Sequence, residues 1–229
     1  RFAGSVHVRS SSASQQVYVL GIDVGTQGAR VLLCDPQGRV VALAERPLPP
    51  CSSASLPSGW SEQHPSDWWT ATRRSLQRVC GLAKDVGINT SAIVGISVTS
   101  TSGTVCMVDA AGNVLRPALM YNDGRALEEA QEVNRVGAAL AQKLGYRFSS
   151  SFALPKLVWL RRHQPDLFHQ ARHFLSPTDF IVGRLTGSFG VTDYSNALKT
   201  GYDLIDGRWP DFIASELGIP EERLPGVVA

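Results

Sequence analysis

Three apolar segments lie within the first fifty residues, and the turns between them are short enough to require antiparallel pairing. The segments are "VYVLGIDV" (17–24), "ARVLLCD" (29–35) and "VVALAERPLP" (40–49). Only "GTQG" and "PQGR" separate them, whereas a parallel crossover needs about a dozen residues. The amino-terminal part is therefore expected to form a three-stranded antiparallel ribbon.

Helical and strand patterns alternate after this ribbon. Helices are predicted where apolar side chains recur every three or four residues, at 65–87, 124–145, 155–171 and 211–218. A strand is predicted at 92–100, and a strand pair that turns at "AAGN" is predicted at 103–123. This order of elements predicts one α/β domain.

The composition is that of an ordinary globular chain. Of its 229 residues 43% are hydrophobic and 18% are charged, and the net charge of +2 gives no basis for binding nucleic acid or a membrane. The four cysteines form no CxxC pair, which predicts reduced thiols in a cytoplasmic protein. Residues 1–16 are rich in serine and are predicted to form a flexible leader, with a mitochondrial presequence as the alternative.

The first turn carries side chains that suit a metal-bound polyphosphate. In "GIDVGTQGAR" a glycine-rich turn can present consecutive backbone N–H groups to an anion. Asp23 lies inside an apolar strand, which is explained if it holds a hydrated Mg²⁺ beside phosphate. The alternative is a plain surface hairpin with a solvated Asp23. The predicted phosphate-binding residues are Gly25, Thr26, Gln27 and Arg30.

Five blocks of the sequence occur in an order that resembles the FGGY carbohydrate kinases, and xylulokinases most of all. The blocks are "GIDVGTQGARVLLCDPQGRVV", "GWSEQHPSDWW", "VLRPALMYNDGR", "PKLVWLRRHQPDLF" and "TDYSNALKTGYDL". The resemblance implies an α/β fold of the actin-like ATPase (ribonuclease H-like) type, with a mixed sheet and flanking helices. Residues 17–229 would form the sugar-binding N-terminal domain.

The resemblance also implies a reaction, the transfer of the γ-phosphoryl group of Mg-ATP to a sugar or polyol hydroxyl. Asp23 would be important for activity and lie near the metal, and Thr26 and Arg30 would approach the phosphates. The general base would be an aspartate beyond residue 229, and the ATP-binding domain would also lie outside this chain. We therefore expect the 229 residues alone to be inactive.

Two further segments are expected to hold the sugar. In "TSTSG", Thr101 and Ser102 offer the neutral donors and acceptors that sugar hydroxyls need. This motif departs from those of xylulokinases and glycerol kinases and resembles that of some ribulokinase-like members, which puts the identity of the sugar in doubt. In "MYNDGR", Tyr121 can pack on a sugar face, and Asn122, Asp123 and Arg125 can hydrogen-bond to its hydroxyls. The alternative for Asp123 is a helix N-cap.

Two other positions have both a functional and a structural interpretation. The motif "TDYSNA", with Thr192, Asp193 and Asn196, suits either a cleft wall or a structural turn. Lys156 follows Pro155 in the predicted first turn of a helix, where a lysine is usually exposed and solvated.

The expected function is ATP-dependent phosphorylation of a pentulose such as D-xylulose, with ATP and Mg²⁺ as cofactors. The alternatives are a D-ribulokinase-like or other polyol kinase, and a non-catalytic sugar- or nucleotide-binding module of the same fold. The expected partners are a small sugar and ATP, and a homodimer is expected because members of this family are often dimers.

Overall fold

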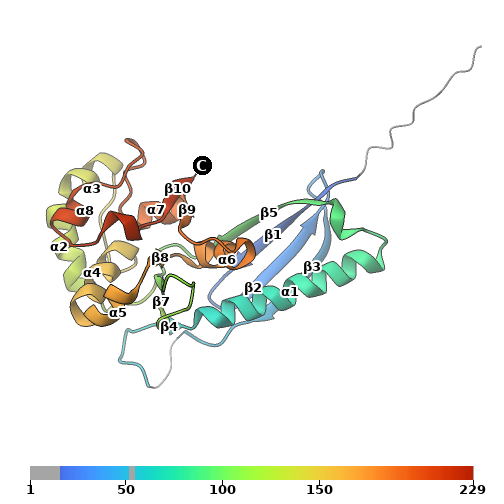
Figure 1. Ribbon diagram of the computed structural model, residues 1–229, viewed down its shortest axis with the longest axis horizontal. Helices are drawn as coiled ribbons and strands as arrows, with labels where there is room; N and C mark the ends of the chain where they lie inside the picture. The colour runs from blue at the N-terminus through green and yellow to red at the C-terminus, as the bar shows by residue number, and fades with distance from the viewer. Residues whose placement is uncertain (1–15, 52–54, 229) are drawn as a thin grey trace, which may run out of the picture.

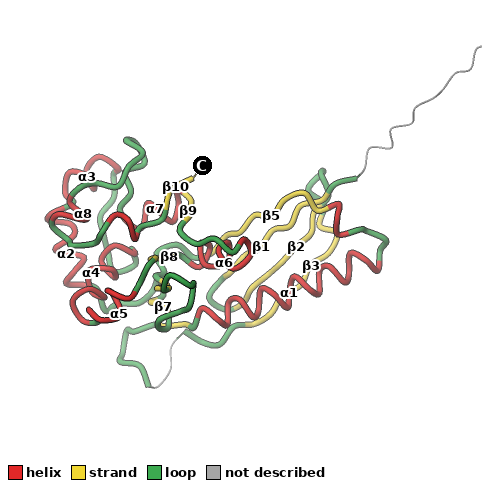
Figure 2. The backbone as a smooth tube through the Cα atoms, viewed as in Figure 1, coloured by secondary structure: helices red, strands yellow, loops and turns green. Residues whose placement is uncertain are grey.

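The computed structural model describes residues 16–51 and 55–228, so the predicted leader lies outside the described part except for its last residue. A four-stranded sheet forms one end of the molecule and most of the helices gather at the other end (Figure 1). Figure 2 shows the same division, with the long strands on one side and the short helices on the other.

The sheet has the strand order β3-β2-β1-β5. Strands β1 (Tyr18–Val24), β2 (Gly28–Cys34) and β3 (Val40–Pro47) are antiparallel neighbours, which confirms the predicted ribbon. Strand β5 (Ile93–Ser100) lies parallel to β1 on its other side. Alternate residues of β1 are buried, as expected for a sheet with one covered face.

The long helix α1 (Pro65–Asp85) covers one face of the sheet. His64 caps its N-terminus by accepting from the backbone N–H of Ser66, and Pro65 occupies the first turn. Its buried side chains recur at helical spacing, including Trp68, which is 1% exposed. The hydroxyl of Ser75 donates to the backbone oxygen of Ala29 at 3.2 Å and so fixes the helix on β2.

Helix α6 (Pro177–Thr186) contacts the end of β5 and packs against α1. It begins with a capping box, in which Ser176 and Asp179 each accept from the backbone N–H of the other. The hydroxyl of Ser100 accepts from the backbone N–H of Thr178 at 3.0 Å. The carboxyl end of β5 is therefore joined directly to the beginning of α6.

The second end of the molecule is built from short helices. These are α2 (Leu127–Val136), α3 (Ala138–Leu144), α4 (Ala153–His163), α5 (Pro165–Gln170), α7 (Tyr194–Thr200) and α8 (Phe212–Ser215). The structure divides two predicted single helices. The helix predicted at 124–145 divides at Gly137, where the Phe212 ring lies 2.9 Å from the position of an added Cβ. The helix predicted at 155–171 divides before Pro165, because a proline disfavours a helical conformation of the residue before it.

Short strands connect the two ends of the molecule. The paired segments are β4 (Glu62–Gln63) with β7 (Ala118–Leu119), β6 (Cys106–Val108) with β8 (His173–Leu175), and β9 (Val191–Asp193) with β10 (Gly226–Val228). The single-turn 3-10 helices are η1 (Thr90–Ala92) and η2 (Glu221–Arg223). The predicted strand pair at 103–123 is confirmed in part. The chain turns at 110–113 and pairs antiparallel through the bridges of Val108 with Val114 and of Val105 with Leu119, but the regular ladders of β6 and β7 are formed with β8 and β4.

The apolar side chains form two cores, one between the sheet, α1 and α6, and one among the short helices. The four cysteines are free, as predicted. No helix among residues 16–51 and 55–228 is long and apolar enough to cross a membrane.

Candidate functional site

Asp23 lies near the carboxyl end of β1 on the face of the sheet opposite the buried residues Ile22 and Val24. Its side chain is 45% exposed, and Arg30 donates to Oδ2 at 3.3 Å. Arg30 also forms an ion pair with Glu45 at 3.1 Å. The carboxylates of Glu45 and, to a smaller extent, Asp23 raise the pKa of the Arg30 guanidinium. Asp23 is thus accessible from solvent and already faces a positive charge.

The strand register places four polar residues in one row across the sheet. Thr99 on β5 is the partner of Asp23 on β1, which pairs with Arg30 on β2, and Arg30 pairs with Glu45 on β3. Side chains that share a register position point to the same face. The predicted metal residue and the strand that leads to the predicted sugar motif therefore meet on one accessible surface.

Gln63, which sequence reasoning missed, supports the turn between β1 and β2. Its side-chain amide donates to the backbone oxygen of Thr26 at 3.1 Å and to that of Pro49 at 2.7 Å. Its side-chain oxygen accepts from the indole N–H of Trp68 at 2.6 Å. Gln63 is only 3% exposed, so the turn is held by hydrogen bonds from a buried side chain. Nothing in the sequence distinguishes Gln63 from its polar neighbours.

One open hollow brings the predicted phosphate turn and a predicted sugar residue together. Thr26 and Gln27 line it on one side and Tyr121 and Asn122 on another, and its volume is about 330 Å³. Tyr121 is 38% exposed, and its backbone N–H donates to the hydroxyl of Thr104 at 3.0 Å. The aromatic ring is therefore available to a ligand while its main chain is fixed.

A second hollow, of about 440 Å³, lies where β5 ends beside the beginning of α7. Ser102 lines it together with Thr99 and Ser100 of β5. Asp193, the last residue of β9, and Asn196 of α7 line its other side. Thr101 is half-buried between its two serine neighbours. Asp193 fits both interpretations of its motif, the cleft wall and the structural turn. It lines the hollow, and it also caps α7 by accepting from the backbone N–H of Asn196 at 2.9 Å.

Asp123 does not reach either hollow, and this corrects its predicted role in sugar binding. It is fully buried, and both its oxygens accept from Arg125 at 2.8 Å. Oδ2 also accepts from the backbone N–H of Ser61 at 2.6 Å. The N-cap alternative is also wrong, because Ala126 precedes the first residue of α2. Asp123 instead pairs with Arg125, whose side chain is 1% exposed and lines neither hollow, so the predicted sugar contact of Arg125 is corrected as well.

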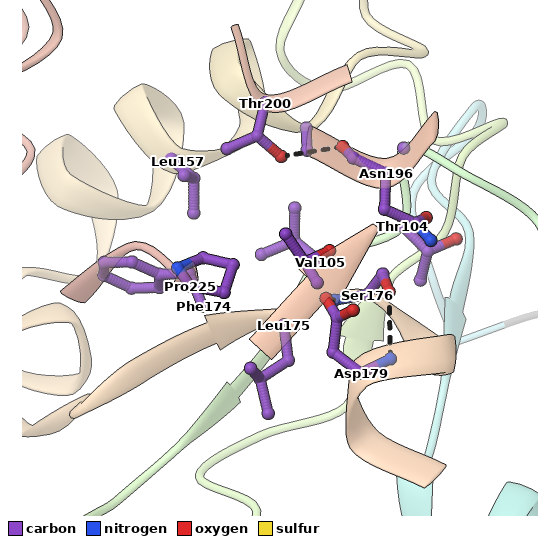
Figure 3. Close-up of a pocket in the computed structure, with 13 residues that line it drawn as sticks. Thr104, Val105, Leu157, Phe174, Leu175, Ser176, Asp179, Asn196, Thr200 and Pro225 are labelled. Carbon is purple, nitrogen blue, oxygen red and sulfur yellow. Dashed lines mark hydrogen bonds between the residues drawn. The ribbon is translucent and has the colours of Figure 1, made fainter. Parts of the chain in front are cut away.

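A small enclosed cavity of about 10 Å³ lies behind these hollows, between β8, α6, α7 and α4 (Figure 3). Figure 3 shows the Asp179 side chain directed into the space between Val105 and Ser176. Oδ1 of Asp179 and the side-chain oxygens of Thr192 and Asn196 have no hydrogen-bond partner among the described residues. Burial raises the pKa of Asp179 to about 7. The cavity is near the lower limit for one water molecule, too small for a sugar.

Asp23 is the residue best placed to hold a metal ion. The described residues contain no cluster of three or more His, Cys, Asp or Glu side chains suited to a metal. A half-exposed single carboxylate fits an ion that is held mainly by water and phosphate oxygens, as Mg²⁺ usually is. It does not fit a metal held by protein ligands alone.

The chain has clear relatives among kinases of known sequence. Residues 18–229 match the model of the N-terminal domain of the FGGY family of carbohydrate kinases. The xylulose kinase of Escherichia coli K12 is 34% identical over 212 residues, which cover 91% of this chain and 41% of that protein. The glycerol kinase of Thermococcus gammatolerans is 32% identical, over 92% of this chain and 42% of that protein. The chain thus spans less than half the length of these relatives.

Solved structures agree with the sequence comparison. A crystal structure of a xyloylose kinase from Brucella ovis superposes with a TM-score of 0.83 at 32% identity, over 92% of this chain and 43% of that one. This likeness confirms the expected α/β fold of the actin-like type, with its mixed sheet and flanking helices. From its sequence, its fold and its solved relatives, the chain belongs to the FGGY family of carbohydrate kinases.

Proposed function

We propose that residues 17–229 are the sugar-binding domain of an ATP-dependent kinase that phosphorylates a pentulose such as D-xylulose. The observation that carries this proposal is the shared hollow of Thr26 and Tyr121, close to the row that contains Asp23. A phosphate-binding turn beside a sugar-binding ring is what transfer between ATP and a sugar requires.

The residues of the first turn would act on the phosphates. The backbone N–H of Thr26 and its hydroxyl can donate to phosphate oxygens, and the Gln27 amide can do the same. Arg30 lies within reach of Asp23 and can neutralise negative charge that develops during transfer. Asp23 would hold Mg²⁺ through water, and the ion would supply positive charge that offsets the negative charge of the phosphates.

The sugar would lie against Tyr121 and the end of β5. Tyr121 offers an exposed ring for the apolar face of a sugar, and Asn122 beside it offers an amide. Ser102 and Thr101 offer hydroxyls to the hydroxyl groups of the ligand. The sugar hydroxyl would lose its proton to a general base and form a bond to the γ-phosphorus of ATP, while the bond from that phosphorus to the ADP oxygen breaks and ADP leaves.

The direct test uses the whole protein encoded by the gene that carries this sequence. ADP formation from ATP and Mg²⁺ is measured with D-xylulose, D-ribulose, glycerol and gluconate in parallel. We expect the highest kcat/KM with D-xylulose, because xylulose kinases are prominent among the relatives. A preference for glycerol would support the polyol alternative, which the glycerol kinase relatives favour.

A second measurement separates an enzyme from a binding module. Calorimetry of the whole protein with the same four compounds reports binding without turnover. Sugar binding with no ADP formation above the sugar-free rate would contradict the kinase proposal and support a non-catalytic module. Binding and turnover of the same sugar would support the kinase. Sedimentation of the same sample tests the expected homodimer.

A further inference from the structure

Lys156 is buried at the beginning of α4, contrary to the expectation of a solvated lysine. Its relative exposure is 0%, and Nζ is surrounded by main-chain oxygens. Lysine side chains near a helix N-terminus point back toward the preceding turn, which explains this direction. Nζ lies 2.5 Å from the oxygen of Ser150, 3.1 Å from that of Gly103, 3.3 Å from that of Phe152 and 3.5 Å from that of Tyr121.

These four oxygens belong to three segments that are far apart in the sequence. The first segment contains Gly103, the second contains Tyr121, and the third contains Ser150 and Phe152. The first two segments carry side chains that the proposed function uses, because Ser102 precedes Gly103 and Tyr121 lines the open hollow. The Lys156 ammonium therefore joins the backbone of Gly103, next to Ser102, to the backbone of Tyr121. Ser102 and Tyr121 are the two parts of the proposed sugar site.

The first and third segments are also packed backbone to backbone. Gly103 has a φ of +86°, and a Cβ added there would lie 2.1 Å from the oxygen of Ser151. No side chain fits between them, so a displacement of the segment at 149–152 is transmitted to Gly103 and its neighbour Ser102. The Lys156 ammonium also donates to the backbone oxygens of Gly103 and Ser150, so it joins the same two segments a second time.

The surroundings of Lys156 act on its charged form in both directions. Burial is the largest effect and lowers the pKa of Lys156 to about 7. The nearby cations Lys199 and Arg125 also lower this pKa, whereas the carboxylate of Asp123 raises it. The positive end of the α4 dipole also disfavours a cation here. The carbonyl oxygens favour the charged form, which has three N–H donors to offer them. An apolar side chain would leave these buried oxygens without a donor.

We propose that Lys156 is a positioning residue for the sugar, which holds the segments of Ser102, Tyr121 and Ser150 in one arrangement through their main-chain oxygens. The inference rests on the proposed function. It assigns no contact between Lys156 and the sugar, because the ammonium lies beneath the main chain of the site.

Hydrogen exchange of the whole protein tests the link without any substrate. Lys156→Met keeps the length of the side chain and removes its donors, and Lys84→Met, at an exposed lysine of α1, is the matched control. We expect the hydrogen-bonded amides of Tyr121 and Phe152 to exchange at least about ten-fold faster in Lys156→Met, with α1 unchanged. Unchanged rates at both amides, or an equal increase throughout the chain, would overturn the link.

Kinetics of the whole protein test the effect on the sugar. We expect Lys156→Met to raise KM for the sugar about ten-fold with no resolvable change in KM for ATP, and Lys84→Met to change neither. Lys156→Ala should regain the wild-type KM in the presence of propylammonium, which supplies the missing carbons and donors, and not with tetramethylammonium, which has no donor. If Lys156→Met lowers Tm and leaves KM for the sugar unchanged, Lys156 contributes to stability alone and does not position the sugar.

The two tests also separate this inference from the proposed function. If no sugar is phosphorylated by the wild-type protein, the proposed function and the sugar part of the inference both fail, and hydrogen exchange alone decides whether Lys156 links the three segments. If Lys156→Met does not fold, Lys156→Ala is purified with propylammonium. Exchange at Tyr121 and Phe152 should then accelerate when the amine is removed, and an exchange rate independent of the amine would contradict the link.

Discussion

Asp23 and Arg30 lie directly opposite each other on β1 and β2, and a guanidinium N–H of Arg30 donates to Oδ2 of Asp23 at 3.3 Å. The side chains are 45% and 49% exposed, so solvent screens the pair and its contribution to stability is small. The same arrangement presents a carboxylate and a cation side by side on an open surface. The proposed roles of Asp23 and Arg30 in metal and phosphate binding can therefore be tested separately from their effect on stability.

Asp23→Asn should separate activity from stability. In the whole protein we expect turnover to fall by at least about a hundred-fold, because an amide holds a hydrated Mg²⁺ poorly, while Tm stays close to that of the wild type. Glu45→Gln removes the other partner of Arg30 and is the matched control, with little expected change in turnover. Unchanged turnover in Asp23→Asn, measured by ADP release, would remove Asp23 from the mechanism.

Gly103→Ala tests the close approach between the backbones of Gly103 and Ser151, beneath the proposed sugar site. The new Cβ would lie 2.1 Å from the oxygen of Ser151, and φ is +86°, so we expect a loss of at least about 3 kcal/mol of unfolding free energy. Gly38→Ala is the control, because Gly38 has a similar φ of +79° and nothing within 4 Å of an added Cβ. Its expected cost is about 1 kcal/mol. Equal losses in urea unfolding would show that the contact with Ser151 is unimportant.

The features predicted correctly from the sequence are those that depend on neighbouring residues. The ribbon follows from alternating side chains and short turns, and α1 follows from helical spacing after Pro65. The predicted helix divides at Gly137, where the ring of Phe212, distant in the sequence, lies 2.9 Å from the position of an added Cβ, and a glycine inside a helical pattern is only a weak local signal of such a break.

The candidate site follows the same rule. The position of Asp23 could be predicted because it breaks an apolar strand beside a glycine-rich turn. The burial of Asp123 depends on Arg125 and Ser61, and the role of Lys156 depends on three segments that only the fold brings together. Main-chain oxygens have no signature in a sequence, so residues that bind them are missed.

Arg125→Met should be among the most destabilising substitutions in this region. The guanidinium lies 3.7 Å from the centre of the Trp60 ring and pairs with the buried carboxylate of Asp123. Removing it leaves that carboxylate without its cation, which typically costs about 3–5 kcal/mol. Urea unfolding measures this loss.

Arg184→Met provides the comparison for this prediction. Arg184 is exposed, and its guanidinium lies 5.3 Å from the centre of the Trp69 ring. An exposed contact of this kind contributes about 1 kcal/mol at most. Similar losses in the two variants would contradict the structural role that we assign to the Arg125 and Asp123 pair.

Asp179 gives the chain a specific dependence of stability on pH. Burial raises its pKa from 3.8 to about 7, although the backbone N–H of Ser176, which donates to Oδ2, opposes the rise. Between these values the folded chain keeps a proton that the unfolded chain has lost, so unfolding free energy falls as pH rises from about 4 to about 7. The loss over this window is on the order of 4 kcal/mol. Above pH 7 both states are ionised at this residue and its contribution is constant.

Asp179→Asn should remove this dependence, because an amide does not titrate and can still accept from the backbone N–H of Ser176. The measurement is urea unfolding of the wild type and the variant at intervals from pH 4 to pH 7. Their difference in unfolding free energy should change steadily in favour of the variant as pH rises. Asp166→Asn, at an exposed position of α5, should follow the wild-type curve. Parallel curves for Asp179→Asn and the wild type would show that Asp179 ionises in the folded chain as easily as in the unfolded one.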